Sequence, residues 1–135
     1  SGSALAWVHG LDTDFNDPMA VVVDGSGRAV VAGTGRGFAS NGAPTATGTD
    51  GRSCPTSGGP QSPAWVMRIK ADGSALEQRV YLCGNGAKRI GDIALDQDDN
   101  AYVIGSTSAA DLTTLAAFQP ASGGGEDAFV AKVTA

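Results

Sequence analysis

The run from Asp96 to Asn100 has the clearest spacing of metal-ligating side chains in the chain. Asp96, Asp98 and Asn100 stand at alternate positions, as oxygen ligands do in calcium loops. The run lacks the Gly and the distal Glu of an EF-hand, and its counterpart Asp24-Gly25-Ser26-Gly27 has one acidic residue. Asp and Asn also favour tight turns. We favour a plain hairpin turn over calcium, and we predict no cofactor.

Acid–base chemistry has few candidates. His9 is the only histidine, and no partner is suggested near it in sequence. Triads are assembled in space, but a lone histidine on a strand is more often structural or exposed. The acidic residues that could form a glycosidase-type pair all fall in predicted turns, where such groups are ordinarily solvated: Asp12, Asp14, Asp17, Asp111, Glu126 and Asp127. We expect no enzymatic activity.

The two cysteines, Cys54 and Cys83, form a candidate disulfide. The bond would close a loop of about 28 residues, which restricts the unfolded chain by about 3 kcal/mol. Two unrelated thiols are the alternative. Their spacing does not suggest a metal site.

A long loop, residues 36–63, is the candidate recognition region. It is rich in Gly, Pro, Ser and Thr and contains few residues that build a core. Long loops on rigid scaffolds often carry recognition, although an insertion that only covers a neighbouring surface is the alternative. The candidate binding residues within it are Arg36, Phe38, Asn41, Asp50 and Arg52.

Two hairpins provide the framework for these residues. Residues 93–105 combine an apolar run, a polar turn and a second apolar run, which predicts two strands joined by a tight turn. Residues 19–33 have the same layout, with Asp24 at the position of Asp96. The run at 20–23 is apolar throughout, as expected of a strand covered on both faces.

The hairpins belong to an internal repeat. Residues 2–5 recur at 73–76, 71 positions later, and the strand at 64–69 recurs at 128–133, 64 positions later. The repeat divides the chain into units 1–71 and 72–135, the first with about eight extra residues in its loop.

Each unit contains four short strand-like runs. The first is Leu5 to His9, or Leu76 to Leu82; the hairpin gives two more; the last is Trp65 to Ile69, or Phe129 to Val133. The last run alternates, with Trp65, Met67 and Ile69 on one face. Four antiparallel strands repeated radially are typical of a β-propeller. We predict an all-β fold of two four-stranded antiparallel propeller blades.

The second unit resembles the bacterial SBBP (β-propeller) repeat. The resemblance covers residues 91–107, Ala117-Phe118-Gln119 and 123–133, and residues 81–86 resemble the Tyr-Leu-Gly-Gly-Ser-Gly stretch of that family. The first unit keeps the hairpin and the Trp65 strand only. The resemblance implies an exported bacterial protein, secreted, periplasmic or at the cell surface, and supplies no catalytic residues.

The strand order predicts an incomplete assembly. If each hairpin gives the inner strands of a blade, Trp65 or Phe129 lies in the third strand and Leu5 or Leu76 in the fourth. The chain then begins with a fourth strand and ends with a third, so the end of one copy fits the start of another. Two blades cannot close a ring of four to eight. We expect completion by other copies, other subunits or further blades of a longer chain.

Charge and composition limit the partners. The net charge of −5 disfavours nucleic acid and anionic membrane surfaces. No apolar run reaches the roughly 18 residues that span a bilayer. The sequence has neither an initiator Met nor a signal peptide, and we expect its start to be processed or excised.

Two functions follow from these observations. The first is a non-catalytic structural or interaction module. The alternative is a carbohydrate-binding, lectin-like propeller assembled from two-blade subunits. Duplicated sugar sites would require equivalent residues in both units, yet Trp7 corresponds to Gln78 and Tyr102 to Val30. We favour the interaction module.

Overall fold

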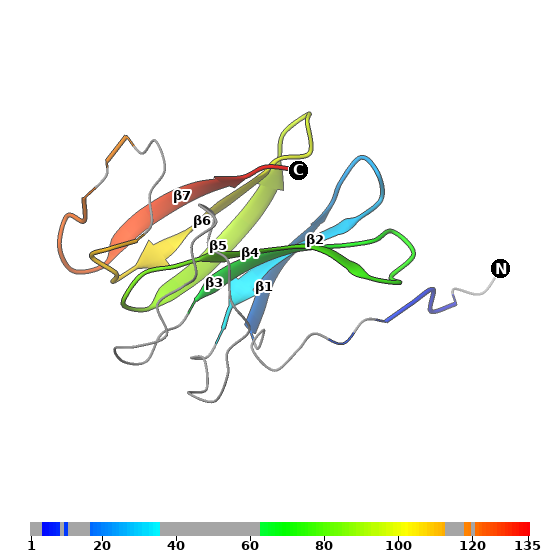
Figure 1. Ribbon diagram of the computed structural model, residues 1–135, viewed down its shortest axis with the longest axis horizontal. Coiled ribbons are helices and arrows are strands. Elements are labelled where there is room, and N and C mark those ends of the chain that lie inside the picture. Colours follow the sequence, from blue (N-terminus) through cyan, green and yellow to red (C-terminus); the bar gives the residue numbers. More distant parts are fainter. Residues whose placement is uncertain (1–3, 9, 11–16, 36–62, 113–117, 120) are drawn as a thin grey trace.

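Seven strands build the described part of the chain. The computed structural model describes residues 4–8, 10, 17–35, 63–112, 118–119 and 121–135, and the statements below concern these residues. They contain no helix, and the strands (Figure 1) are β1 (Asp17–Val23), β2 (Ala29–Thr34), β3 (Ala64–Ile69), β4 (Leu76–Leu82), β5 (Lys88–Leu95), β6 (Ala101–Thr107) and β7 (Asp127–Val133). The predicted all-β fold is confirmed for this part.

The turns of the two predicted hairpins have the same geometry. In the β1–β2 turn, the Asp24 N–H donates to Arg28 O at 3.1 Å, and the Gly27 N–H donates to Asp24 O at 2.9 Å. The β5–β6 turn makes both bonds at the equivalent positions. Gly27 and Asp99 have φ angles of 79° and 62°, a left-handed backbone that glycine adopts freely and aspartate tolerates. Both hairpins are therefore confirmed.

A glycine lies beneath an aromatic ring at the same place in both sheets. Gly33 pairs with Trp65, and Gly105 pairs with Phe129. A methyl group on either glycine would collide with that ring and with a backbone carbonyl of the adjacent strand. Trp65 and Phe129, which the repeat made equivalent, thus occupy the same structural position.

The strands form two antiparallel sheets. Sheet 1 has the order β1-β2-β3-β4 and sheet 2 the order β5-β6-β7. The Trp65 strand is third and the Leu76 strand fourth in sheet 1, as predicted. The second four-stranded sheet is not formed, because the described part of the chain contains no strand beside the free edge of β7. The two sheets do not close into a ring.

The strand predicted from Leu5 to His9 is absent from residues 4–8, and His9 lies outside the described residues. This prediction is wrong for the described part of the segment. Its repeat counterpart, β4, is extended because β3 pairs with it along its length. No described strand pairs with residues 4–8, so no sheet hydrogen bonds hold this segment extended.

The prediction that residues 20–23 are covered on both faces is also wrong. Ala20 and Val22 pack against the core, whereas Val21 is 62% exposed and Val23 is exposed as well. β1 is the edge strand of sheet 1 and meets β5 on one face only. Its apolar run therefore reflects β-propensity in addition to burial.

The core lies between the two sheets. One apolar cluster joins five residues of sheet 1 with five of sheet 2: Val30, Ala32, Ala64, Val66, Leu82, Ile90, Ile93, Ala101, Val103 and Val133. β5 packs against β1 and β2 across this interface. A second cluster, of Trp65, Met67, Tyr81 and Cys83, lies on the opposite face of sheet 1. The predicted alternation of β3 is confirmed, because Trp65 and Met67 belong to one cluster and Val66 to the other.

The two sheets stack head to tail. Sheet 1 contributes Val30 and Val66 to the interface, whereas their repeat counterparts Tyr102 and Val130 lie on the outward face of sheet 2. Sheet 2 instead contributes Val103, the counterpart of Val31, which packs in the second cluster of sheet 1. The two sheets therefore meet through non-equivalent faces. The outward face of sheet 2 is equivalent, by the repeat, to the face that sheet 1 buries against sheet 2.

Candidate interaction surface

Several sequence candidates lie outside the described residues. These are the loop residues Arg36, Phe38, Asn41, Asp50 and Arg52, together with His9, Asp12, Asp14 and Cys54. Cys83 follows β4 and is buried beside Trp65 and Tyr81. There is no free cysteine in the described part of the chain. Because Cys54 is not described, the Cys54–Cys83 disulfide stays a prediction.

Asp111 and Glu126, two of the acidic residues considered for a carboxylate pair, lie in turns as predicted. The predicted turn is wrong for Asp17 and Asp127, which are the first residues of β1 and β7. Asp111, Glu126 and Asp127 each accept a hydrogen bond of 2.6 Å from a neighbouring polar group. Asp17 begins β1 and pairs with Thr34 in register. The hydrogen bonds of Glu126 and Asp127 tie loops to strands, and the bond of Asp111 joins two loops.

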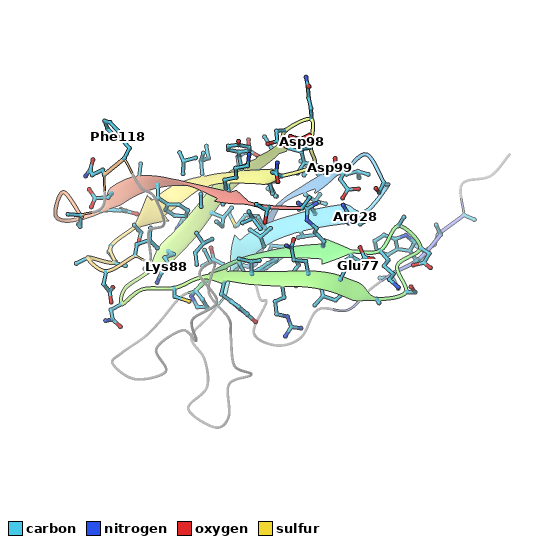
Figure 2. All side chains as sticks on the ribbon, turned by 45° about the horizontal axis from the view of Figure 1, so that its top comes forward. Arg28, Glu77, Lys88, Asp98, Asp99 and Phe118 are labelled. Carbon is cyan, nitrogen blue, oxygen red and sulfur yellow. The ribbon has the colours of Figure 1, made fainter. Side chains whose placement is uncertain are left out.

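Lys88 is a buried cation that the sequence analysis did not single out. Its Nζ donates to Gly84 O at 2.5 Å and to Gly86 O at 2.9 Å, which holds the β4–β5 connection against β5 (Figure 2). Burial lowers the pKa of Lys88, and the charge of Asp111 opposes this effect. Both of these acceptors are backbone carbonyls, so the place of Lys88 in the fold is structural.

Asp96, the first calcium candidate, is surrounded by donors. Oδ1 accepts the N–H groups of Asp98 and Asn100 at 3.0 and 2.9 Å, and Oδ2 accepts Lys132 Nζ at 3.0 Å. Hydrogen bonds from the Asn100 side chain and from Lys132 hold the pKa of Asp96 well below its usual range. These contacts are typical of an Asx turn. Within the described ranges, no three His, Cys, Asp or Glu side chains are grouped to hold a metal.

Asp24, the counterpart of Asp96, forms a buried ion pair. Its Oδ2 accepts Arg28 Nε at 2.7 Å and Arg68 Nη1 at 3.2 Å, while Oδ1 accepts the N–H groups of Ser26 and Arg28. Burial raises the pKa of Asp24, but the hydrogen bonds from Arg28 and Ser26 outweigh burial, and the pKa is lowered. The Asp24 carboxylate is therefore held ionised beside Arg68.

Arg68 connects the two sheets. Its Nη2 donates to the backbone carbonyl of Asp99 at 2.6 Å, and its Nε donates to Gln78 Oε1 at 2.8 Å. Gln78 Nε2 donates to Thr134 O at 3.0 Å, and the Gly25 N–H donates to Asp99 Oδ1 at 2.9 Å. Figure 2 shows Asp99 on the β5–β6 turn beside the turn of β1 and β2. The turn and the C-terminal end of sheet 2 are thus fixed to sheet 1 by polar contacts.

A shallow, open groove lies beside this network. Its lining residues come from the β1–β2 turn and from the β3–β4 connection with the start of β4: Ser26, Arg28, Lys70, Ala71, Asp72 and Glu77. Arg28 Nη1 and Glu77 Oε2 are 3.7 Å apart (Figure 2). Two of the charged groups that line the groove, Arg28 and Glu77, therefore form an ion pair with each other.

The outward face and free edge of sheet 2 form the candidate surface. Tyr102, Ile104 and Val130 are exposed on this face, with Val130 at 71%. Lys132 lies among them, with Nζ 4.9 Å from the centroid of the Tyr102 ring. β7 pairs with β6 on one side, and no described strand pairs with its other side. We name these features together, the outward face with Tyr102, Ile104, Val130 and Lys132 and the free edge of β7, the sheet-2 surface.

Sequence reasoning missed the polar network and this exposed face. The signal for the network was a cation at the same place in two apolar strands, Arg68 and Lys132.

Comparison with protein families, with curated proteins and with solved structures found no match. Across the described ranges, no helix is both long and apolar enough to cross a membrane.

Proposed function

We propose that this chain is a non-catalytic structural and interaction module built of two β-propeller-type blades. The observation that carries the proposal is the head-to-tail stacking of the sheets, after which no described sheet covers the sheet-2 surface. Each further blade would bury the kind of face that sheet 1 already buries against sheet 2. The partners are other copies, other subunits or additional blades.

The strand order supports blades of this kind. Sheet 1 has four antiparallel strands in the order of a propeller blade, and sheet 2 has three. Two blades are too few for a ring, and an exposed apolar face with an open edge favours association. The resemblance of the second unit to the SBBP repeat supports an exported or cell-surface setting in bacteria.

The test is the mass of the chain in solution across a range of concentrations. Sedimentation velocity is expected to show association, and Val130→Glu is expected to weaken it at least tenfold. The matched control is Phe118→Glu, because Phe118 is fully exposed in the β6–β7 connection and belongs to neither sheet. A monomer at every concentration, or equal effects of the two substitutions, would contradict the proposal. A glycan array tests the lectin-like alternative: binding would favour a lectin, and no binding would favour the interaction module.

A further inference from the structure

The third strand of each sheet has a different environment. β3 is paired along both edges, with β2 and with β4. β7, the repeat counterpart of β3, is paired with β6 alone among the described strands. The outer edge of β7 therefore presents backbone N–H and C=O groups that can bind an added strand.

Residues 4–8 have the sequence of such a strand. Residues 2–5 repeat residues 73–76, which lead into β4. Leu5 and Val8 are 82% and 81% exposed, and residues 4–8 pair with no described strand. An exposed apolar segment and an open edge are thus both without a strand partner.

We propose that residues 4–8 of a second copy of this chain add an antiparallel fourth strand to β7. The inference rests on the proposed function and specifies its partner. The β3–β4 pairing, in which Ile69, Arg68 and Met67 face Leu76, Gln78 and Arg79, sets the register. By the repeat, Leu5 lies opposite Val133, Trp7 opposite Lys132, and Val8 opposite Ala131.

The side chains fit this register. In sheet 1 a cross-strand row runs Val22, Val30, Arg68 and Gln78, and Arg68 donates to Gln78 at 2.8 Å. The row in sheet 2 is Ala94, Tyr102 and Lys132. Trp7 would complete it and bring a second ring to the Lys132 ammonium, which already lies over Tyr102. The change from Arg–Gln to Lys–Trp preserves a favourable cross-strand pair.

The position of residues 4–8 favours donation to a second copy. Trp7 Nε1 donates to Ala71 O at 3.1 Å, so the segment lies beside the β3–β4 turn of its own chain. Figure 1 shows residues 4–8 extending beyond that turn, away from β7. Pairing with a second copy requires release of this contact but no rearrangement of either sheet.

Disulfide trapping between two chains tests the register. Val8→Cys in one chain and Ala131→Cys in a ¹⁵N-labelled chain are mixed and oxidised, and heterodimers are counted by intact mass. Directly opposed residues of neighbouring strands have Cα atoms about 4.5–5.5 Å apart, within disulfide range. Val130→Cys replaces Ala131→Cys in the control, because Val130 is one residue out of register and on the other face. Circular dichroism checks that each variant is folded.

We expect the Val8–Ala131 heterodimer in at least tenfold excess over the Val8–Val130 heterodimer. Equal yields, no heterodimer, or an intramolecular disulfide in the V8C/A131C double variant would overturn the inference. If unmodified chains associate in sedimentation velocity without this cross-link, the strand register fails while the proposed function stands. If they neither associate nor cross-link, both fail.

Discussion

Arg68 and Lys132 occupy the same position in successive sheets, yet their side chains are 1% and 44% exposed. Each forms an ion pair with the first residue of the hairpin turn in its own sheet, Asp24 or Asp96. Arg68 also reaches the backbone of the next sheet at Asp99, whereas Lys132 faces outward. The difference in exposure arises because sheet 2 covers Arg68, whereas no sheet in the described part of the chain covers Lys132.

Replacement of the buried cation should be costly. Arg68→Met leaves the Asp24 carboxylate buried without its cross-strand partner and removes the bond to Asp99, so we expect a loss of about 3 kcal/mol in the free energy of unfolding. Lys132→Met is the matched control and should cost much less stability, because exposed ion pairs contribute little. Urea unfolding of both variants measures the difference. Similar losses in the two variants would contradict the interpretation.

The two hairpin aspartates predict a dependence of stability on pH. The pKa values of Asp24 and Asp96 are lowered in the folded chain, and an unfolded aspartate has a pKa of about 3.9. The unfolded chain therefore binds protons more readily. The stabilisation is present above about pH 4 and is lost as the pH falls through the lower folded values.

Urea unfolding at a series of acidic pH values checks this dependence. Asp96→Asn should reduce the acid-induced loss of stability, because it removes one of the carboxylates whose pKa is lowered in the folded chain and keeps a side-chain acceptor in the turn. Asp98→Asn is the matched control, because it removes a carboxylate from the same turn and keeps the backbone bond to Asp96; it should reduce the acid-induced loss less than Asp96→Asn does. A parent-like profile for Asp96→Asn would show that the turn bonds do not set the dependence.

The glycine beneath the Phe129 ring should resist substitution. In Gly105→Ala the added methyl group meets both the ring and the Arg89 carbonyl, and overpacking of this kind costs about 1–3 kcal/mol. Gly91→Ala is the control, since its nearest neighbour would lie at 3.6 Å, an ordinary contact. Thermal unfolding compares the two, and equal midpoints would contradict the packing argument.

The predicted disulfide is tested by mass and by reduction. Intact mass spectrometry with alkylation should find no reactive thiol in the native chain and two after reduction. Reduction should lower the free energy of unfolding by about 3 kcal/mol, from the restriction of the loop. Alkylation of Cys54 or Cys83 in the unfolded, unreduced chain would show that the bond is absent.

The sequence predicted the elements that depend on local chemistry. The hairpins follow from Asp24 and Asp96, whose carboxylates and backbones close turns over four residues, and strand order follows from the repeat. Features that depend on contacts between distant parts of the chain were harder to predict from the sequence. Leu5 was expected in a strand because it resembles Leu76, but a strand needs a neighbour and β4 has β3 beside it. The exposure of Val21 depends on which sheet face meets β5.

The inter-sheet network could not be predicted, because its partners are far apart in sequence. Arg68 and Asp99 are separated by 31 positions, and Gly25 and Asp99 by 74. Only the stacking of one repeat on the next brings them together. The available signal was a cation flanked by apolar residues in a strand. It did not indicate which groups would accept its hydrogen bonds.

Asp99 occupies a left-handed position that Gly27 fills in the first hairpin. A left-handed backbone is less favourable for aspartate than for glycine, but the Asp99 carboxylate accepts a hydrogen bond from the Gly25 N–H of the neighbouring turn. A local backbone cost in one repeat is thus offset by a bond in the other. The two repeats consequently form one cooperative unit: neither hairpin keeps its full complement of bonds when the other melts, and a single thermal transition is the natural outcome.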